Sequence, residues 1–176
     1  MVVALGANLP WQGQPATQTL VDAVSRLQRS GHFQDLRVSS FWRSSPVQAQ
    51  GPDFVNGVLV ARSEVTPEQL LALLLETERA FGRDRSASLL TTDKPLGLSP
   101  ARTLDLDLIA VGDLHRQTAD LRLPHPRATE RAFVLEPLAE LAPSLVLQHP
   151  SGESARVADW LARLPSDVRA QLHPVE

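Results

Sequence analysis

The clearest alternation of apolar and polar residues lies between residues 102 and 111, in the run RTLDLDLIAV. Its three leucines would point to one side of a strand while Asp105 and Asp107 point to the other, because side chains in a strand alternate between the two faces. The last four residues are wholly apolar, which indicates burial on both faces. The pattern therefore predicts a strand over residues 102–111 whose first half has one polar face.

Three strands and two helices are predicted before this strand. They are expected at residues 2–6, 36–44 and 54–60 for the strands, and at about 15–30 and 66–81 for the helices. Gly31 and Gly82 are placed to end the two helices. Thr66 and Gln69 have the spacing of a capping box, with a proline at the first helical position. The strands at 36–44 and 54–60 would be antiparallel.

The pattern is weaker elsewhere. Residues 86–101 are rich in Ser, Thr, Pro and Gly and predict a long loop, and long loops inside compact domains are often functional. Further elements are expected at residues 121–123 and 145–147 as short strands, and at 124–133, 138–141 and 154–164 as helices. The tail after Pro165 carries little signal.

The order of the elements up to residue 111 is strand, helix, strand, strand, helix, strand. This is the split βαβ order of a ferredoxin-like α+β fold, in which both helices lie on one face of an antiparallel sheet. The later elements would form a small C-terminal extension. Because 176 residues can build one substantial core and no linker interrupts them, we expect residues 1–176 to form a single domain.

Composition narrows the possible functions. The sequence is 43% hydrophobic, but it has no apolar run of membrane-spanning length and no basic segment at its start, so we expect a cytoplasmic protein without a membrane partner. A net charge of −3 gives no indication of a nucleic-acid partner. The absence of cysteine excludes disulfides and thiolate chemistry.

The acidic pair on the central strand is the first candidate site. Asp105 and Asp107 share one strand face, and two carboxylates that close repel each other unless a cation lies between them. Oxygen ligands suit Mg²⁺, which usually takes one or two carboxylates together with substrate phosphates. The alternative is that the two aspartates only solvate a half-exposed strand, and on spacing alone this is the commoner explanation.

Three arginines flank the long loop. Arg83 and Arg85 precede it and Arg102 follows it, and guanidinium groups match phosphate oxygens in geometry and charge. The alternative for the first two is that they stabilise the end of the preceding helix through its dipole. We therefore consider phosphate binding and helix stabilisation as comparable explanations for this pair.

His125 and Arg131 form another candidate group. His125 lies between two prolines, which would present its imidazole rigidly, and Arg131 follows at the start of a predicted helix region. A helix-capping histidine is the alternative. Glu78 lies five residues before Arg83 and could join the same site, although an exposed surface position is the commoner fate of a glutamate.

Two aromatic residues and an amide could hold a flat ring. Phe54 and Asn56 would share a strand face, and Phe133 lies near the end of a short helix. Aromatic faces stack on heterocycles, and an amide can pair with a heterocycle edge through a donor and an acceptor. The alternative is that both phenylalanines belong to the core and that Asn56 is a turn residue.

In combination, these patterns resemble the 6-hydroxymethyl-7,8-dihydropterin pyrophosphokinases of folate synthesis. The resemblance covers about residues 3–143 in a consistent order. It rests on GANL at 6–9, SSFWRSSP at 39–46, PDFVN at 52–56, RTLDLDL at 102–108, and PHPR to RAFVL at 124–135. The last two blocks are the most specific.

The resemblance implies that diphosphate is transferred from ATP to the hydroxymethyl group of a reduced pterin, leaving AMP. It implies two Mg²⁺ ions on Asp105 and Asp107, with Arg83 and Arg102 joining them in catalysis. The implied nucleotide and phosphate contacts are Glu78, Arg83, Arg85, Arg102, Leu108, His125 and Arg131. The implied pterin pocket consists of Ser44, Ser45, Val47, Phe54, Asn56 and Phe133. We expect ATP and the pterin as small-molecule partners of a monomer.

Two other classes of function are compatible with parts of the pattern. A non-catalytic ferredoxin-like module could bind a nucleotide or regulate a partner, and it would release no AMP in a pterin-dependent way. An Asp-x-Asp sugar-nucleotide transferase would usually need a larger α/β scaffold, so the length of 176 residues argues against it.

Overall fold

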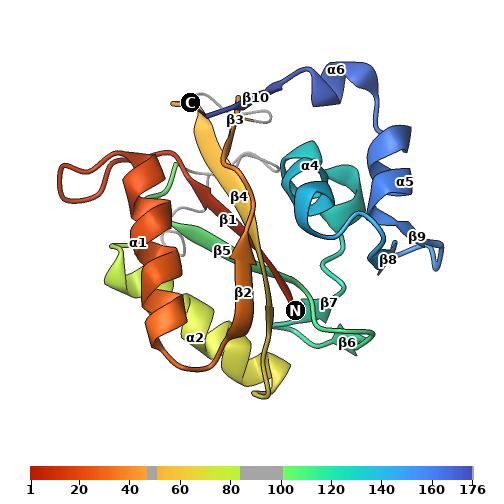
Figure 1. Ribbon diagram of the computed structural model, residues 1–176, viewed down its shortest axis with the longest axis horizontal. Coiled ribbons are helices and arrows are strands. Elements are labelled where there is room, and N and C mark those ends of the chain that lie inside the picture. Colours follow the sequence, from red (N-terminus) through yellow and green to blue (C-terminus); the bar gives the residue numbers. More distant parts are fainter. Residues whose placement is uncertain (47–50, 84–100, 176) are drawn as a thin grey trace.

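A six-stranded antiparallel sheet forms the centre of the computed structural model, which describes residues 1–46, 51–83 and 101–175 (Figure 1). Its strands are β1 (Val2–Ala7), β2 (Gln34–Val38), β3 (Trp42–Ser44), β4 (Phe54–Arg62), β5 (Asp105–Ala110) and β10 (Leu172–Pro174). The order across the sheet is β10-β3-β4-β1-β5, and β2 also pairs with β4. Every strand pair is antiparallel. The predicted mixed α+β class with an antiparallel sheet is therefore confirmed.

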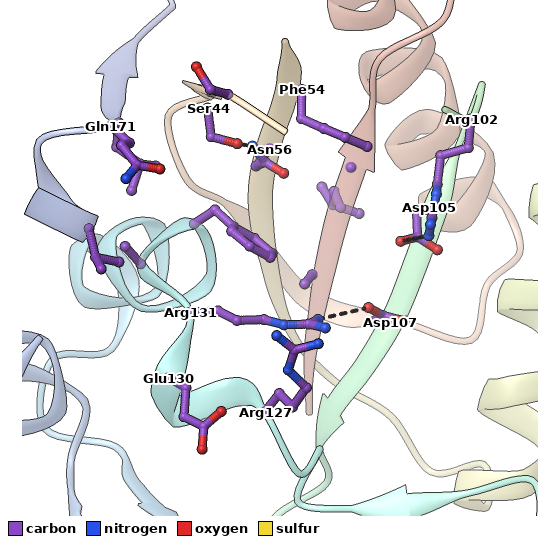
Figure 2. Close-up of a pocket in the computed structure, with 18 residues that line it drawn as sticks. Ser44, Phe54, Asn56, Arg102, Asp105, Asp107, Arg127, Glu130, Arg131 and Gln171 are labelled. Atoms are coloured by element: carbon purple, nitrogen blue, oxygen red, sulfur yellow. Dashed lines mark hydrogen bonds and ion pairs between the residues drawn. The ribbon is translucent and has the colours of Figure 1, made fainter. Parts of the chain in front are cut away.

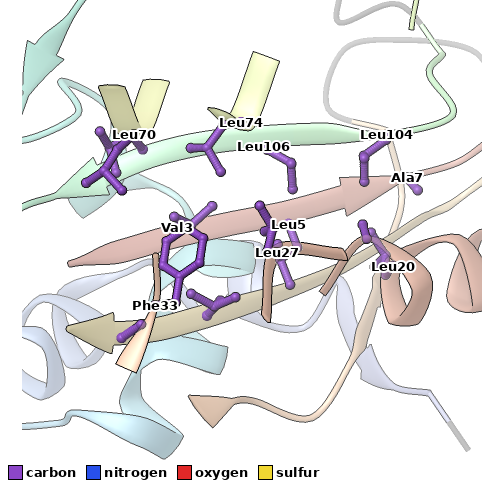
Figure 3. Close-up of a cluster of buried hydrophobic side chains, with 14 of the residues drawn as sticks. Val3, Leu5, Ala7, Leu20, Leu27, Phe33, Leu70, Leu74, Leu104 and Leu106 are labelled. Atoms are coloured by element: carbon purple, nitrogen blue, oxygen red, sulfur yellow. The ribbon is translucent and has the colours of Figure 1, made fainter. Parts of the chain in front are cut away.

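Helices α1 (Ala16–Arg29) and α2 (Pro67–Ala80) cover one face of this sheet (Figures 1 and 3). Helix α2 begins with the predicted capping box, because the Thr66 side chain accepts from the Gln69 backbone and the Gln69 side chain accepts from the Thr66 backbone. Both helices lie against one apolar cluster. Its members include Leu5, Leu20, Leu27, Leu59, Leu70, Leu74, Leu104 and Leu106. The expectation that both helices share one face is correct.

The opposite face is covered by α4 (Ala132–Leu141) and α5 (Val157–Arg163) (Figure 1). A second apolar cluster joins these helices to residues of β1, β4 and β5 that face away from α1 and α2. The remaining elements are short. They are β6 (Arg116–Gln117), β7 (Arg122–Leu123), the 3-10 helix η1 (Ala128–Glu130), β8 (Val146–Gln148), β9 (Ser154–Arg156) and α6 (Ser166–Arg169). None of the helices in the described ranges is long and apolar enough to cross a membrane.

The expected strand at 36–44 is divided into β2 and β3. Both segments pair with β4, but Ser39 interrupts the ladder because its hydroxyl accepts the Val58 N–H at 3.0 Å. Phe41 then lies over Gly57, where a β-carbon would be only 2.8 Å from the Phe41 ring. The break between β2 and β3 thus coincides with the position where the Phe41 ring packs over Gly57.

The expected helix end at residue 133 and new helix at 138 are also wrong, since α4 runs continuously through Pro137. An interior proline costs about 3 kcal/mol, and each fully buried aliphatic side chain returns about 1.5–3 kcal/mol. Val134, Leu135 and Leu138 are all completely buried on this helix, which outweighs the cost. The apolar packing decides the outcome.

Three further boundaries differ from expectation. The central strand begins at Asp105 rather than at residue 102, and residues 154–156 form β9 before helix α5 begins. The tail after Pro165, in which no element was expected, contains α6 and β10. The predicted loop at 86–101 lies outside the described residues except for its last position.

Candidate functional site

A cavity of about 340 Å³ opens between the sheet and the elements that follow β5 (Figure 2). Its volume is at the small end of the range of about 300–1,000 Å³ that is usual for small-molecule sites. The charged end is lined by Arg102, Asp105, Asp107, Arg127, Glu130 and Arg131. The less polar end is lined by Ser44, Ser45, Phe54, Asn56, Phe133, Val168, Gln171 and Leu172. The two predicted groups of residues therefore meet in one cavity.

Strand β5 turns Asp105 and Asp107 toward this cavity. It pairs with β1 so that Gly6 lies opposite Asp105 and Ala4 lies opposite Asp107. The alternating residue Leu106 is buried in the cluster beneath α1 and α2. The alternation of the sequence therefore puts both carboxylates on one face, as expected, because the other face must bury the leucines.

Arginines on two different elements hold Asp105. Arg83 pairs with one of its carboxylate oxygens and Arg102 pairs with the other. Arg102 is fixed in turn by its backbone, because its N–H donates to the Asn8 side chain at 2.7 Å while its carbonyl accepts the N–H groups of Asn8 and Leu9. The turn after β1 thus positions Arg102, which lies three residues before the start of strand β5.

Glu78 ties helix α2 to the edge of the sheet. Its side chain is 1% exposed, accepts the backbone N–H of Leu106 at 2.8 Å and pairs with Arg83. Strand β5 is at the sheet edge, so this carboxylate satisfies a backbone donor that no neighbouring strand reaches. Glu78 therefore lies behind the cavity wall, and Arg83 pairs with both Glu78 and Asp105.

The turn between α2 and Arg83 requires a glycine. Gly82 has a φ of +77°, and a β-carbon there would lie 2.0 Å from the ring of Trp11. A side chain at this position would have to displace the indole. The indole and the glycine together fix how the chain leaves the helix toward Arg83.

Asp107 has a strongly perturbed acidity. Burial, reinforced by the negative charge of Asp105, raises the pKa of Asp107 to about 6, although Arg131 and Arg102 oppose the change. The Arg131 guanidinium lies 3.7 Å from the Asp107 carboxylate (Figure 2), and its own pKa is lowered by burial. A cavity wall that disfavours an ionised carboxylate in this way is a place where an added cation is stabilised.

The donor set suits a hard cation. Asp105 and Asp107 offer only oxygen ligands, which is what Mg²⁺ prefers. Within the described ranges, no group of three or more His, Cys, Asp or Glu side chains could enclose a metal ion. A magnesium ion here would therefore complete its shell with water or with phosphate oxygens of a ligand.

His125 lies beside the charged end rather than in the cavity wall. Its backbone N–H donates to the Ile109 carbonyl at 2.8 Å, and its ring Nδ1 accepts the Arg127 N–H at 3.1 Å. Burial, together with the charge of Arg131, lowers the pKa of His125 to about 4. The imidazole is therefore neutral near pH 7.

At the less polar end, Asn56 is buried and held in place. Its amide nitrogen donates to the Ser44 hydroxyl at 2.9 Å, and Ser44 belongs to the neighbouring strand β3. Phe54 and Phe133 approach the cavity from β4 and α4, and the Arg131 guanidinium lies 5.4 Å from the centre of the Phe133 ring. Aromatic faces and a fixed amide can together hold a flat, polar ring.

Some predicted residues lie elsewhere. Val47 and Arg85 are outside the described residues. Leu108 is buried in the cluster under α1 and α2, so its side chain faces away from the cavity. Several cavity residues were not predicted as site residues. They include Arg127 and Glu130 around η1, Val168, Gln171 and Leu172 in the tail, and Ala4, Leu5, Gly6 and Ala132 on β1 and α4. The tail has no local signal for this role, since its place depends on pairing with β3.

An acidic pair that faces arginines, beside a pocket with aromatic walls and a fixed amide, suits an enzyme that holds a polyphosphate next to a flat ring. Comparison with known proteins gives the family. The family model for 7,8-dihydro-6-hydroxymethylpterin-pyrophosphokinase matches residues 2–143. The chain belongs to this family.

Individual relatives agree with the family match. The 2-amino-4-hydroxy-6-hydroxymethyldihydropteridine pyrophosphokinase of Synechocystis sp. is 39% identical over 145 residues, which cover 82% of this chain and 67% of that protein. A protein of the same name from Pseudomonas aeruginosa is 38% identical over 164 residues, covering 93% of this chain and 90% of that protein. The folic acid synthesis protein fol1 of Pneumocystis carinii is 32% identical over 149 residues, covering 84% of this chain and 18% of that protein. This chain is a diphosphokinase of folate biosynthesis.

Proposed function

We propose that this chain transfers diphosphate from ATP to the hydroxymethyl group of 6-hydroxymethyl-7,8-dihydropterin, releasing AMP and the pterin diphosphate. One observation carries the proposal: a single cavity joins Asp105 and Asp107 to the ring-binding residues Phe54, Asn56 and Phe133. The hydroxyl oxygen attacks the β-phosphorus, the bond from that phosphorus to the α–β bridging oxygen breaks, and the hydroxyl proton passes to solvent. Such a transfer needs both ligands in line in one site.

Asp105 and Asp107 would hold Mg²⁺, and two ions are expected from the resemblance. The metal would neutralise the phosphate oxygens and stabilise the charge that develops on the leaving AMP oxygen. Support comes from the oxygen-only donor set and from the raised pKa of Asp107, which is due first to burial and then to the charge of Asp105; a bound cation would offset both effects. Asp105 is unsuited to act as a base, since its oxygens are occupied by arginines and would be occupied by metal.

The arginines would exchange partners when the nucleotide binds. Arg83 and Arg102 now neutralise Asp105, and a metal ion on that carboxylate would free their charge for the triphosphate. Arg131, already beside Asp107, would contact the transferred phosphates. Arg85 and His125 would add further nucleotide contacts, and Glu78 would act by orienting Arg83.

The pterin would occupy the less polar end. Phe54 and Phe133 would stack on the two faces of the ring, and Asn56 with Ser44 and Ser45 would contact its polar edge. Val47 is expected in the same pocket from the resemblance. We also propose that the sheet is ferredoxin-like. The supporting features are the order β3-β4-β1-β5 and the two helices on one face. It remains a prediction that residues 1–176 form a single domain and that the protein is a monomer in the cytoplasm.

The proposal is tested by incubating the protein with ATP, Mg²⁺ and the reduced hydroxymethylpterin, followed by mass spectrometry. We expect equal amounts of AMP and pterin diphosphate. Formation of ADP and pterin monophosphate would indicate ordinary phosphoryl transfer. ATP binding without pterin-dependent AMP would indicate a non-catalytic binding module.

A matched pair of variants tests the metal assignment. Asp107→Ala should abolish AMP formation while the protein remains folded, because it removes a proposed ligand from the cavity. Asp113→Ala changes an exposed aspartate in the turn after the same strand and should retain activity. A Mg²⁺-dependent activity in Asp107→Ala equal to that of the control would refute the assignment.

A further inference from the structure

We infer that the C-terminal segment at residues 168–172 is part of the substrate site, with Leu172 as an apolar wall for the pterin ring and Gln171 as a polar contact at its rim. This inference rests on the proposed function. Three side chains of the segment, those of Val168, Gln171 and Leu172, line the same cavity as Phe54 and Asn56. In Figure 2, Gln171 lies across the cavity from Arg102 and Asp105, with Ser44, Asn56 and Phe54 between them.

The segment is fixed to the sheet rather than loosely laid over it. Strand β10 pairs with β3 so that Leu172 lies opposite Ser44, the residue whose hydroxyl accepts from Asn56. The Val175 N–H donates to the Phe41 carbonyl at 2.9 Å. On the other side, the Arg169 guanidinium lies 3.4 Å from the Glu136 carboxylate on helix α4. The segment therefore bridges β3 and α4, which both contribute to the pocket.

Leu172 has the environment of a ligand contact. Its side chain is 9% exposed, yet it belongs to neither of the two large apolar clusters that make up the core. Its side chain lines the cavity, so a ring that fills the cavity can bury its own apolar face against Leu172, which favours binding.

The strand alternation separates this role from a purely structural one. His173 follows Leu172 on β10, is exposed, and is not among the residues that line the cavity in the described part of the chain. Both residues take part in the same pairing with β3. His173 is therefore a matched control for any effect of weakening β10. The match to the family model ends at residue 143, so this wall comes from a part of the chain that the match does not include.

The test compares Leu172→Ala, Gln171→Ala, Leu172→Met and His173→Ala in the full chain. Pterin affinity is measured by fluorescence titration with 6-hydroxymethyl-7,8-dihydropterin, and nucleotide affinity with a non-hydrolysable ATP analogue and Mg²⁺. We expect Leu172→Ala to raise the pterin Kd about 5- to 30-fold, from the apolar contact that is lost. Gln171→Ala should raise it about 2- to 10-fold through one lost hydrogen bond.

Leu172→Met should retain most of the pterin affinity, because methionine fills a similar apolar volume. His173→Ala should match the wild type for both ligands, and no variant should change the Kd of the ATP analogue by more than about twofold. Equal pterin affinity in Leu172→Ala and His173→Ala, or parallel losses for both ligands, would overturn the inference. If the wild type itself bound ATP but no pterin, the proposed function would fail, a result that is distinct from failure of the wall alone.

Discussion

The buried carboxylate of Glu78 offers the sharpest test of how the site is held together. Glu78→Gln keeps an oxygen that can accept the Leu106 N–H but removes the negative charge that pairs with Arg83. Hydrogen bonds to charged groups contribute about 1.5–3 kcal/mol. The larger loss of about 3–5 kcal/mol that follows when a buried charge loses its partner should not be reached, because Arg83 keeps its pairing with Asp105.

We therefore expect Glu78→Gln to lower the free energy of unfolding by about 1.5–3 kcal/mol. Glu78→Leu should cost roughly a further 1–3 kcal/mol, since it also leaves the Leu106 N–H without its acceptor. The assay is urea unfolding followed by circular dichroism, with the slope of the transition checked for constancy. AMP formation should fall in both variants, because Arg83 loses one of the two carboxylates that orient it and keeps only Asp105.

The matched control is Glu76→Gln on the same helix. Glu76 is 65% exposed and its carboxylate lies 3.1 Å from Arg26, so this surface pair should contribute less than about 1 kcal/mol. The two positions differ in burial and in the backbone bond, but not in residue type. If Glu78→Gln and Glu76→Gln unfolded at the same urea concentration, the reasoning about the buried network would be refuted.

Three other perturbations have defined outcomes. The pKa of His125 falls to about 4 in the folded chain, so the stability from its neutral form is present above about pH 6.5 and is lost as the pH falls toward 4. We place this loss of unfolding free energy between pH 7.5 and pH 4.5 at about 1–2 kcal/mol, after allowing for solvent screening. His125→Gln should reduce it, as measured by unfolding curves at the two pH values. An unchanged dependence of stability on pH would contradict the assignment. Gly82→Ala should lower the free energy of unfolding by at least about 1–2 kcal/mol, because it places a β-carbon against Trp11 on a residue in the left-handed conformation. The melting temperature and AMP formation should both fall. Wild-type values of both would show that the indole moves aside freely. Leu74→Ala, at a completely buried position between α2 and the sheet, should cost about 2–5 kcal/mol in urea unfolding, whereas the exposed Leu114→Ala should cost under about 0.5 kcal/mol, and equal costs would contradict the assigned core.

The local features of the chain were predictable where short-range physics decides them. The capping box at Thr66 and Gln69 and the helix end at Gly82 depend on residues within a few positions, and both are confirmed. The shared direction of Asp105 and Asp107 follows from the period of a strand alone. Predictions failed where distant contacts outweigh local preference, as at Pro137, where the apolar packing of α4 maintains a helix that the sequence alone would end.

The amino-acid sequence by itself determined the order of the main elements and the direction of the two aspartates, because each depends on residues close together in the chain. It also determined the family, because short motifs occur in a consistent order along residues 2–143. Only the tertiary structure decided that Glu78 lies behind β5 and that Leu172 lies opposite Ser44. Those placements depend on which groups remain unpaired at a sheet edge, and the edges exist only once the sheet has formed. A tail with little pattern of its own can therefore become a wall of the site.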